Sequence, residues 1–322
     1  MNISYFRSSS YNCFNLCQHQ YFLNYVLGIP NIVGIKAHKG TITHKVLEIL
    51  AKAKLASQND QSTITDDIFS NNNIPIDQFK TDSFIEYAYN HAFSYYNEKD
   101  QLCLSDADFR EVKRWIYKVI NEGTFDPRNF TIISPERYFS LEIKKDWARL
   151  PNNKYLTIKG TIDLIVEHDN SYEIIDWKTG KCMSYISMKP KTYVDLVDDF
   201  QLRLYHYAMR KLYPHQKNVL VTIHYINDGG PRTITHDDSN LSIVEARLYN
   251  QFVNIRDCVR PIRRDNAQGI FCNRICSYGK HFIDNKTQCQ YIYDQLRLEG
   301  MTSTIANHTF AGFNINDYEE PG

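Results

Sequence analysis

The spacing of hydrophobic positions predicts a helical first third of the chain. Apolar residues recur at helical spacing in four segments, and a polar stretch rich in Asn, Asp and Ser separates the second segment from the third. That stretch, residues 57–80, predicts a loop, so residues from about 57 to 122 are expected to form a helical insertion. The four expected helices cover residues 4–28, 40–52, 84–96 and 106–120.

Short apolar runs typical of strands follow in the middle of the chain. They begin near Phe130, continue through Pro135–Leu141 and Leu156–Ile158, and lead into two runs between Gly160 and Gly180. Both of these runs are apolar on both faces, which is the pattern of buried strands. The short polar turn between them predicts a hairpin.

The last part of the chain returns to a mixed pattern. A buried-strand pattern at 219–226 lies between helices expected at 198–213 and 241–256. The whole order predicts an α/β fold class with a mixed central sheet flanked by helices. No linker divides the chain, so we expect a single domain over residues 1–300 and a flexible tail over 301–322.

The predicted hairpin carries acidic residues inside its apolar runs. A simple turn pairs Glu167 with Tyr172, and counting back along both strands places Asp163 opposite Asp176. Directly opposed Cβ atoms lie about 4.5–5.5 Å apart, so two carboxylates there repel each other. Lys178 follows at a spacing that puts its side chain on the same face as Asp176.

A divalent cation between Asp163 and Asp176 removes this repulsion. Oxygen ligands favour Mg²⁺, with Mn²⁺ as a substitute. Lys178 then supplies a positive charge that stabilises the transition state of phosphodiester hydrolysis. The alternative is a half-exposed hairpin with two surface aspartates, in which Lys178 only neutralises the pair.

Composition narrows the class of protein without identifying it. The chain has 322 residues, 43% of them hydrophobic, with no run long enough to span a membrane and no signal-peptide core, so we expect an intracellular protein without membrane contact. Its 37 basic residues balance 37 acidic ones, so a nucleic-acid partner requires a local basic surface. The sequence has no P-loop motif, so any helicase would be a separate protein.

Three shorter signals are weak by spacing alone. His44 lies on the amphipathic helix that follows Gly40, where a packed core histidine is the usual outcome. Gln201 and Tyr205 share one face of the helix expected at 198–213, as any amphipathic helix would allow.

Together these segments resemble a known family. The runs Gly160–Asp163 and Ile175–Gly180, the G-x-x-x-H helix at Gly40–His44, the Q-x-x-x-Y pair at Gln201–Tyr205 and the element at Ser8–Tyr25 occur in the order of the PD-(D/E)XK nuclease superfamily. The sequence is most similar to the RecB-type exonuclease branch, which includes the AddB nuclease domain and the CRISPR-associated adaptation nucleases. The resemblance spans roughly residues 4–290.

The resemblance implies a restriction-endonuclease-like fold and metal-dependent hydrolysis of DNA, most often from single strands or duplex ends, in repair or recombination. A separate helicase or recombination protein is the implied partner. The alternatives are a structure- or sequence-specific endonuclease of the same superfamily and a catalytically silent DNA-binding module. The residues concerned are His44, Asp163 and Asp176 as metal ligands, Lys178 as the catalytic cation, Gln201 and Tyr205 as DNA-positioning residues, and Glu136 as an additional acidic residue.

The branch often holds a 4Fe–4S cluster on four cysteines, one near the N-terminus and three near the C-terminus. The resemblance assigns Cys17, Cys272, Cys276 and Cys289 to it, in a cysteine-rich staple over about 268–290. The spacing departs from the family pattern: three residues separate Cys272 from Cys276, twelve separate Cys276 from Cys289, and Gln18 replaces a proline. Structural Zn²⁺, with or without His281 as a ligand, and unligated thiols are the alternatives. An Asn- and Tyr-rich composition is compatible with an AT-rich viral genome.

Overall fold

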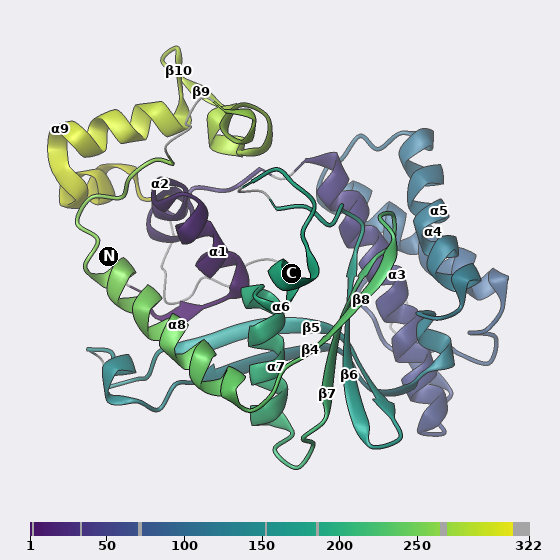
Figure 1. Ribbon diagram of the computed structural model, residues 1–322. Helices are drawn as coiled ribbons and strands as arrows, with labels where there is room; N and C mark the ends of the chain where they lie inside the picture. The colour runs from purple at the N-terminus through teal and green to yellow at the C-terminus, as the bar shows by residue number, and fades with distance from the viewer. Residues whose placement is uncertain are drawn as a thin grey trace.

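A six-stranded mixed sheet forms the centre of the computed structural model, which describes residues 1, 3–32, 34–69, 73–151, 153–184, 187–264 and 269–311 (Figure 1). The strand order is β1–β5–β6–β7–β8, and β4 pairs with the other side of β5. The β1–β5 and β6–β7 pairs are parallel and the remaining pairs are antiparallel. The strands are β1 (Tyr5–Phe6), β4 (Thr131–Glu142), β5 (Thr157–His168), β6 (Ser171–Lys178), β7 (Val219–Tyr225) and β8 (Gly230–Thr235).

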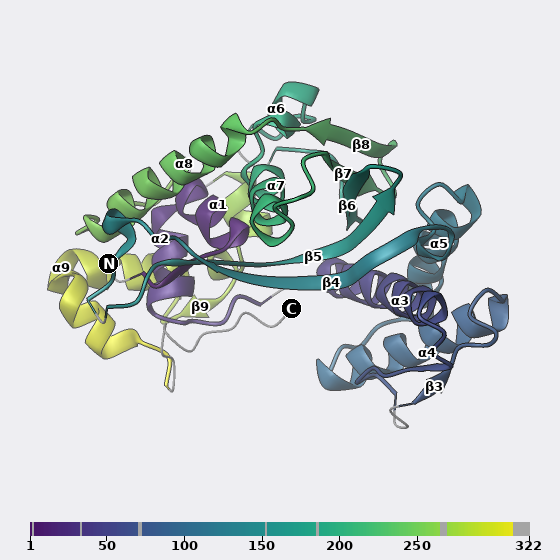
Figure 2. The same ribbon diagram turned by 90° about the horizontal axis from the view of Figure 1, so that it is seen from below.

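Helices cover both faces of this sheet (Figures 1 and 2). On one face, Leu47 of α3 (Ile35–Gln58) packs with Ile175 of β6. On the other face, Leu204 of α7 (Phe200–Leu212) and residues of α8 (Ser239–Arg256) pack with Ile174. The predicted fold class, a mixed sheet flanked by helices, is confirmed.

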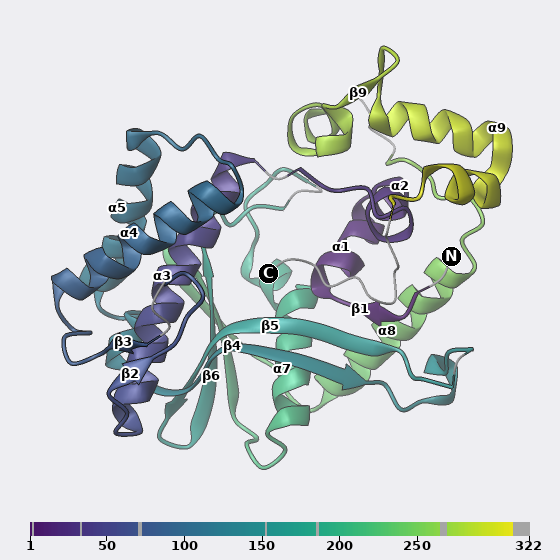
Figure 3. The ribbon, with the colours of Figure 1, turned by 180° about the vertical axis from the view of Figure 1, so that it is seen from behind.

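The predicted helical insertion packs against α3. It contains α4 (Asp82–Lys99) and α5 (Asp106–Glu122), whose apolar faces share one buried cluster with α3. Figure 3 shows these helices beside α3, on the other side of the molecule from α8. The polar stretch 57–80 is more than a loop, because β2 (Thr63–Ile64) and β3 (Ile74–Pro75) pair within it.

The prediction of one helix over residues 4–28 is wrong. Tyr5 and Phe6 form β1, and the helix that follows is interrupted at Cys17, where the backbone is extended with φ −161°. The Cys17 Sγ accepts a hydrogen bond from the Gln20 backbone N–H at 3.4 Å and so caps the next helix. The segments are α1 (Ser8–Leu16), α2 (Gln18–Tyr21) and a π-helical turn at Phe22–Val26.

The helix expected at 198–213 begins later and is preceded by a short one. Asp199 caps α7 by accepting a hydrogen bond from the Gln201 N–H at 2.9 Å, and α6 (Tyr193–Val197) lies just before it. Three-residue 3₁₀ turns complete the central region at Pro127–Asn129 and Asp146–Ala148.

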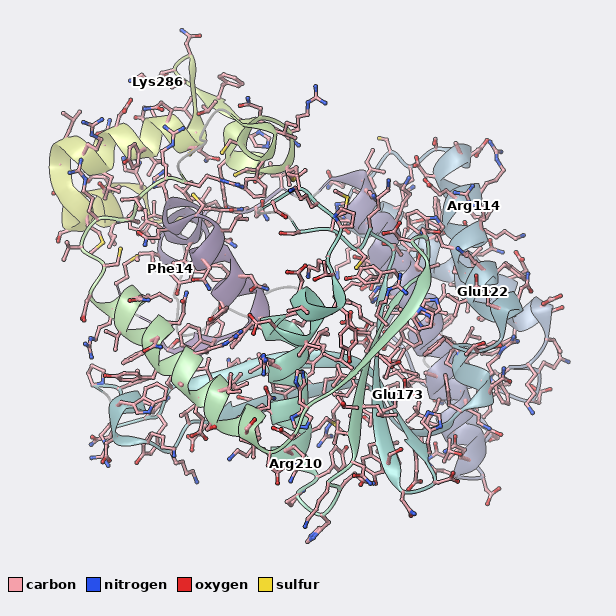
Figure 4. All side chains as sticks on the ribbon, viewed as in Figure 1. Phe14, Arg114, Glu122, Glu173, Arg210 and Lys286 are labelled. Atoms are coloured by element: carbon pink, nitrogen blue, oxygen red, sulfur yellow. The ribbon has the colours of Figure 1, made fainter. Side chains whose placement is uncertain are left out.

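Residues 269–311 form a C-terminal lobe that packs on the N-terminal segment. Its core joins Phe271, Tyr278 and Ile292 to Phe22 and Leu27, separately from the clusters at the sheet. Figure 4 shows Lys286 in this lobe and Arg114 and Glu122 on α5 at the other side of the molecule. The lobe contains a π-helical turn (Phe271–Ile275), a 3₁₀ turn (Ser277–Gly279), β9 (Phe282–Ile283), β10 (Lys286–Thr287) and α9 (Gln288–His308).

The predicted flexible tail over 301–322 is wrong in its first part, because α9 continues to His308. Gly300 kinks this helix with a φ of +78°, a conformation that glycine adopts without steric cost. Residues 312–322 lie outside the described part of the chain.

Candidate active site

The hairpin of β5 and β6 has the predicted register. Glu167 pairs with Tyr172, and the antiparallel ladder ends one residue pair before Asp163 and Asp176. Continuing the register by one step places these two aspartates side by side on adjacent strands. Both aspartates belong to the face of the sheet that α7 covers, because their i±2 neighbours Ile165 and Ile174 pack there.

A third carboxylate joins this row from β4. The residues before and after Glu136 pair with the neighbours of Asp163 on β5, so Glu136 faces Asp163. Its backbone adopts φ +42°, a left-handed conformation that is unusual for a residue within a strand. Glu136, Asp163 and Asp176 thus lie on three adjacent strands.

The site occupies a gap along one side of β5. On that side β1 pairs only with Thr157 and Ile158, and β6 pairs only from Leu164 onward. Between them, the carbonyl oxygen of Thr161 accepts a hydrogen bond from the Tyr205 hydroxyl at 2.9 Å. Tyr205 therefore replaces a missing strand partner, and α7 is anchored beside Asp163.

Each aspartate is neutralised by a basic side chain. Asp163 Oδ2 lies 3.3 Å from His44 Nδ1 and accepts the Trp177 backbone N–H at 3.0 Å. Burial alone would raise the pKa of Asp163, but His44 and Lys178 outweigh it and hold that pKa below its ordinary value. The charge of Asp163 in turn raises the pKa of His44 despite its burial.

Asp176 is the more deeply buried aspartate, with only 1% of its surface exposed. Lys178 Nζ lies 2.8 Å from its Oδ2 and donates to its Oδ1 at 3.0 Å. Burial raises the pKa of Asp176, and Lys178 offsets this only in part because Asp163 also disfavours a second negative charge. Burial lowers the pKa of Lys178, but the two aspartates outweigh burial and raise it, so the lysine stays charged.

The side chains of α7 close the site around Asp176. Gln201 Nε2 lies 3.4 Å from Asp176 Oδ1 and donates to the Tyr205 hydroxyl at 2.8 Å. The same hydroxyl lies 3.4 Å from that carboxylate oxygen. The structure therefore brings both residues of the Q-x-x-x-Y pair to Asp176.

Two neighbouring acidic residues were missed in the sequence. Glu48 lies one turn after His44 on α3 and is bound by Lys45 at 2.6 Å and Lys52 at 2.5 Å. Burial, Asp163 and Glu48 together raise the pKa of Glu136. The second residue is Asp199, because burial lowers the pKa of Lys178 and Asp199 is among the acidic groups that raise it. The i, i+4 spacing of His44 and Glu48 was the available signal for the first residue, and the position of Asp199 just before α7 was the signal for the second.

The donor set fits a divalent cation. Carboxylate oxygens are the ligands that Mg²⁺ prefers, and in the described structure the buried Asp176 Oδ2 has only the Lys178 ammonium, at 2.8 Å, as a partner. Among the described residues, no three His, Cys, Asp or Glu side chains are grouped so that they could hold a metal ion. The aspartates instead contact His44 and Lys178.

The four predicted cluster cysteines lie around one cavity, although among the described residues no three of them are grouped closely enough to hold a metal ion. Cys17, Cys272, Cys276 and Cys289 line one cavity of about 340 Å³, named here the cysteine pocket, between α2 and the C-terminal lobe. His281, the alternative zinc ligand, does not line it. The structure thus brings together cysteines that are up to 272 residues apart in sequence.

Residues 8–280 match the model of the PD-(D/E)XK nuclease superfamily. The match covers most of the chain, and the chain belongs to this superfamily. Its mixed sheet flanked by helices is accordingly a restriction-endonuclease-like fold. A search of the curated proteins found no match.

Two solved structures are distantly similar. A Eubacterium rectale protein described as a "Putative exonuclease" shares 13% identity and a TM-score of 0.48, with 84% of this chain and 89% of that chain covered. The protein SSO0001 shares 14% identity and a TM-score of 0.30, with 74% of this chain and 97% of that chain covered. Neither likeness assigns an activity to this chain.

Membership in the superfamily makes this protein a nuclease, a hydrolase whose substrate is a nucleic acid. Nucleases of the superfamily generally use divalent metal ions such as Mg²⁺. Within the described ranges, no helix has the length and apolar character needed to cross a membrane.

Proposed function

We propose that this protein is a Mg²⁺-dependent deoxyribonuclease that degrades DNA from single strands or duplex ends. The observation that carries the proposal is the row of Glu136, Asp163 and the fully buried Asp176, with Lys178 2.8 Å from the last carboxylate. Such a concentration of acidic groups is unfavourable for the fold by itself, which favours a role for it in function. The motif order of the RecB-type branch supports an exonuclease.

We assign the cation to Asp163 and Asp176, with His44 and Glu136 as further ligands. When bound, a divalent ion supplies Lewis acidity to the phosphate and activates a water molecule. Lys178 keeps its positive charge in the buried site, so it stabilises negative charge that develops on the phosphate. Gln201 and Tyr205 contact Asp176, and we assign them to orienting this carboxylate and positioning the DNA.

The test is cleavage of three DNA substrates by the purified protein. End-labelled single strands, end-labelled duplexes and covalently closed circles are each incubated with Mg²⁺, with Mn²⁺ and with EDTA. We expect cleavage of the two linear substrates in either metal and none of the circle or with EDTA. Cleavage of the circle would identify an endonuclease instead, and DNA binding without cleavage in either metal would identify a binding module.

We also propose that the cysteine pocket holds a 4Fe–4S cluster. Four thiols from three separate segments line a cavity much larger than one zinc ion needs, and Cys17 already accepts a backbone N–H. The group would have a structural role, because it would close a chain loop between the N-terminal segment and the C-terminal lobe. Anaerobic purification should give a brown protein with broad absorbance near ~400 nm and iron in proportion to protein. A colourless protein that contains stoichiometric zinc would contradict this assignment.

A further inference from the structure

The cysteine pocket is positively charged as well as rich in thiols. Arg263, Arg264 and Lys286 line it beside the four cysteines, and no Asp or Glu is among its described lining residues. Lys286 is paired with Asp294 outside the pocket at 2.8 Å. The two arginines are therefore the cations available to the pocket.

Both arginines pack against aromatic rings, without an acidic partner among the residues that the structure describes. The Arg263 guanidinium lies 5.4 Å from the Tyr293 ring centre and donates to Gln290, and the Arg264 guanidinium lies 4.9 Å from the Phe271 ring centre. Within the described part of the chain, neither arginine forms an ion pair, and Arg264 Nη1 is buried without a hydrogen bond. Both arginines are half-buried, and cations that face a partly buried cavity without a counter-ion are unfavourable, so the pocket is suited to an anionic group.

A cluster held by four thiolates would be such a group. Four thiolate charges exceed the charge of an oxidised 4Fe–4S core, so the assembled centre is a dianion, and one-electron reduction makes it a trianion. Positive charges at the wall of the pocket stabilise the reduced form more than the oxidised form, because they interact with one more negative charge.

We propose that Arg263 and Arg264 are the counter-ions of this centre. They raise its reduction potential and slow the loss of its iron from the protein. The inference rests on the cluster proposed above, and it concerns residues outside the four-cysteine motif. A purely structural role is the alternative, since both side chains also stack on aromatic rings. Lysine separates the two roles, because it keeps the charge and lacks the planar guanidinium.

The experiment compares three variants with the wild type after anaerobic reconstitution with iron and sulfide. R263Q/R264Q removes both charges, R263K/R264K keeps them, and R260Q removes the charge of an exposed arginine that does not line the pocket. The readouts are iron per protein and the midpoint potential from a dithionite titration followed by visible absorbance.

The glutamine variant should lose iron faster or show a potential lower by at least about 59 mV, which equals a tenfold change in a one-electron equilibrium. The lysine and R260Q variants should stay close to the wild type. If R263Q/R264Q disturbs folding by circular dichroism, R264Q alone provides the same comparison, since Arg264 makes no side-chain hydrogen bond through Nη1.

Two results would overturn the inference. One is a glutamine variant with wild-type iron content and potential, and the other is a lysine variant as defective as the glutamine variant, which would show a packing role. Failure of the wild type to take up iron would remove the cluster and the counter-ion role together. Mg²⁺-dependent DNA cleavage by the same preparations tests the nuclease proposal separately.

Discussion

Lys178 and the buried Asp176 form an ion pair at the centre of the site, in which the lysine side chain is 35% exposed. A buried pair owes its stability to mutual compensation, so removing one partner leaves an unpaired charge in a poorly solvated place. Asp176 shows this most clearly, because it is 1% exposed and its pKa is raised even with the lysine beside it. The lysine charge that stabilises the fold is also the one that the proposed reaction uses.

Lys178→Met should therefore separate activity from stability. We expect DNA cleavage to fall about 10²–10³-fold, because the electrostatic stabilisation of the transition state is lost. The free energy of unfolding should fall by about 1–3 kcal/mol, since the lysine is partly exposed and Asp176 loses its partner. The double variant Asp176→Asn/Lys178→Met should recover most of this stability and no activity. Lys181→Met, at an exposed lysine nearby, is the control. Additive stability changes in the double variant would contradict the ion-pair argument.

Tyr205→Phe should affect both the fold and the reaction. It leaves the Thr161 carbonyl without its 2.9 Å hydrogen bond, which costs about 1–3 kcal/mol for a buried acceptor. It also removes the hydrogen bond that the Tyr205 hydroxyl accepts from Gln201. Gln201 then no longer orients Asp176 as well, so cleavage should slow by about tenfold. Tyr207→Phe is the matched control, because its hydroxyl bonds Glu245 at 3.1 Å away from the site. Equal loss of cleavage in the two variants would show that Tyr205 is only structural.

The pairing of β4 with β5 depends on one glycine. A Cβ added at Gly160 would lie 2.6 Å from the ring of the buried Phe139 on β4, whereas a Cβ at Gly180 would meet nothing within 4 Å. Both glycines belong to the motif segments, yet only the first is sterically required. Gly160 is required because Phe139 pairs with it across the two strands and leaves no room for a side chain.

Gly160→Ala should accordingly destabilise the protein by about 1–3 kcal/mol, and Gly180→Ala should change stability by less than about 0.5 kcal/mol. Urea unfolding monitored by circular dichroism measures both. In a Phe139→Leu background, the smaller side chain should reduce the cost of Gly160→Ala. An unchanged cost in that background would mean that the ring contact is not the cause.

Much of the sheet was predictable from local pattern. The hairpin register followed from the turn alone, and it placed Asp163, Asp176 and Lys178 together before any long-range contact was known. His44 and the Gln201–Tyr205 pair could not be placed by spacing. Their approach to the aspartates depends on how α3 and α7 pack on the sheet, and only the family resemblance indicated it.

The missed elements have physical reasons in the chain. β8 is an edge strand with only Ile234 buried, so it lacks the apolar run of a central strand. The last helix, α9, buries only Ile292, Leu296 and Thr304 and is kinked at Gly300, so its periodicity is weak. The break at Cys17 interrupts a helical pattern that continues on both sides. In each case tertiary contacts decide the structure.

Three buried histidines lie in three separate regions of the molecule. His19 of α2 faces the C-terminal lobe, where its Nε2 lies 3.0 Å from the Cys289 carbonyl oxygen. His206 lies between α7 and α8, and His224 lies on β7 against Phe125. All three are at most 1% exposed, and burial is the main cause that lowers each pKa to about 4. The stability of three separate regions is therefore linked to pH.

These histidines make the folded protein less stable as the pH falls. An unfolded histidine titrates near ~6.5, so between about pH 6.5 and 4 the unfolded chain binds protons that the folded chain does not. The free energy of unfolding should have its full value above pH 6.5. As the pH falls to 4, proton binding by each unfolded histidine should lower that free energy by about 1–3 kcal/mol. Urea unfolding at a series of pH values measures the total.

His224→Phe isolates one contribution. Neither ring nitrogen of His224 has a hydrogen bond in the described structure, and the ring packs edge-on against Phe125 at 4.7 Å, so phenylalanine can occupy the same space. The variant should equal or exceed the wild type in stability at pH 7 and exceed it increasingly between pH 6.5 and 4, because it has no proton to bind at this position on unfolding. His215→Phe, at an exposed position, should keep the pH dependence of the wild type. Parallel pH curves for His224→Phe and the wild type would show that this histidine is not linked to acid unfolding.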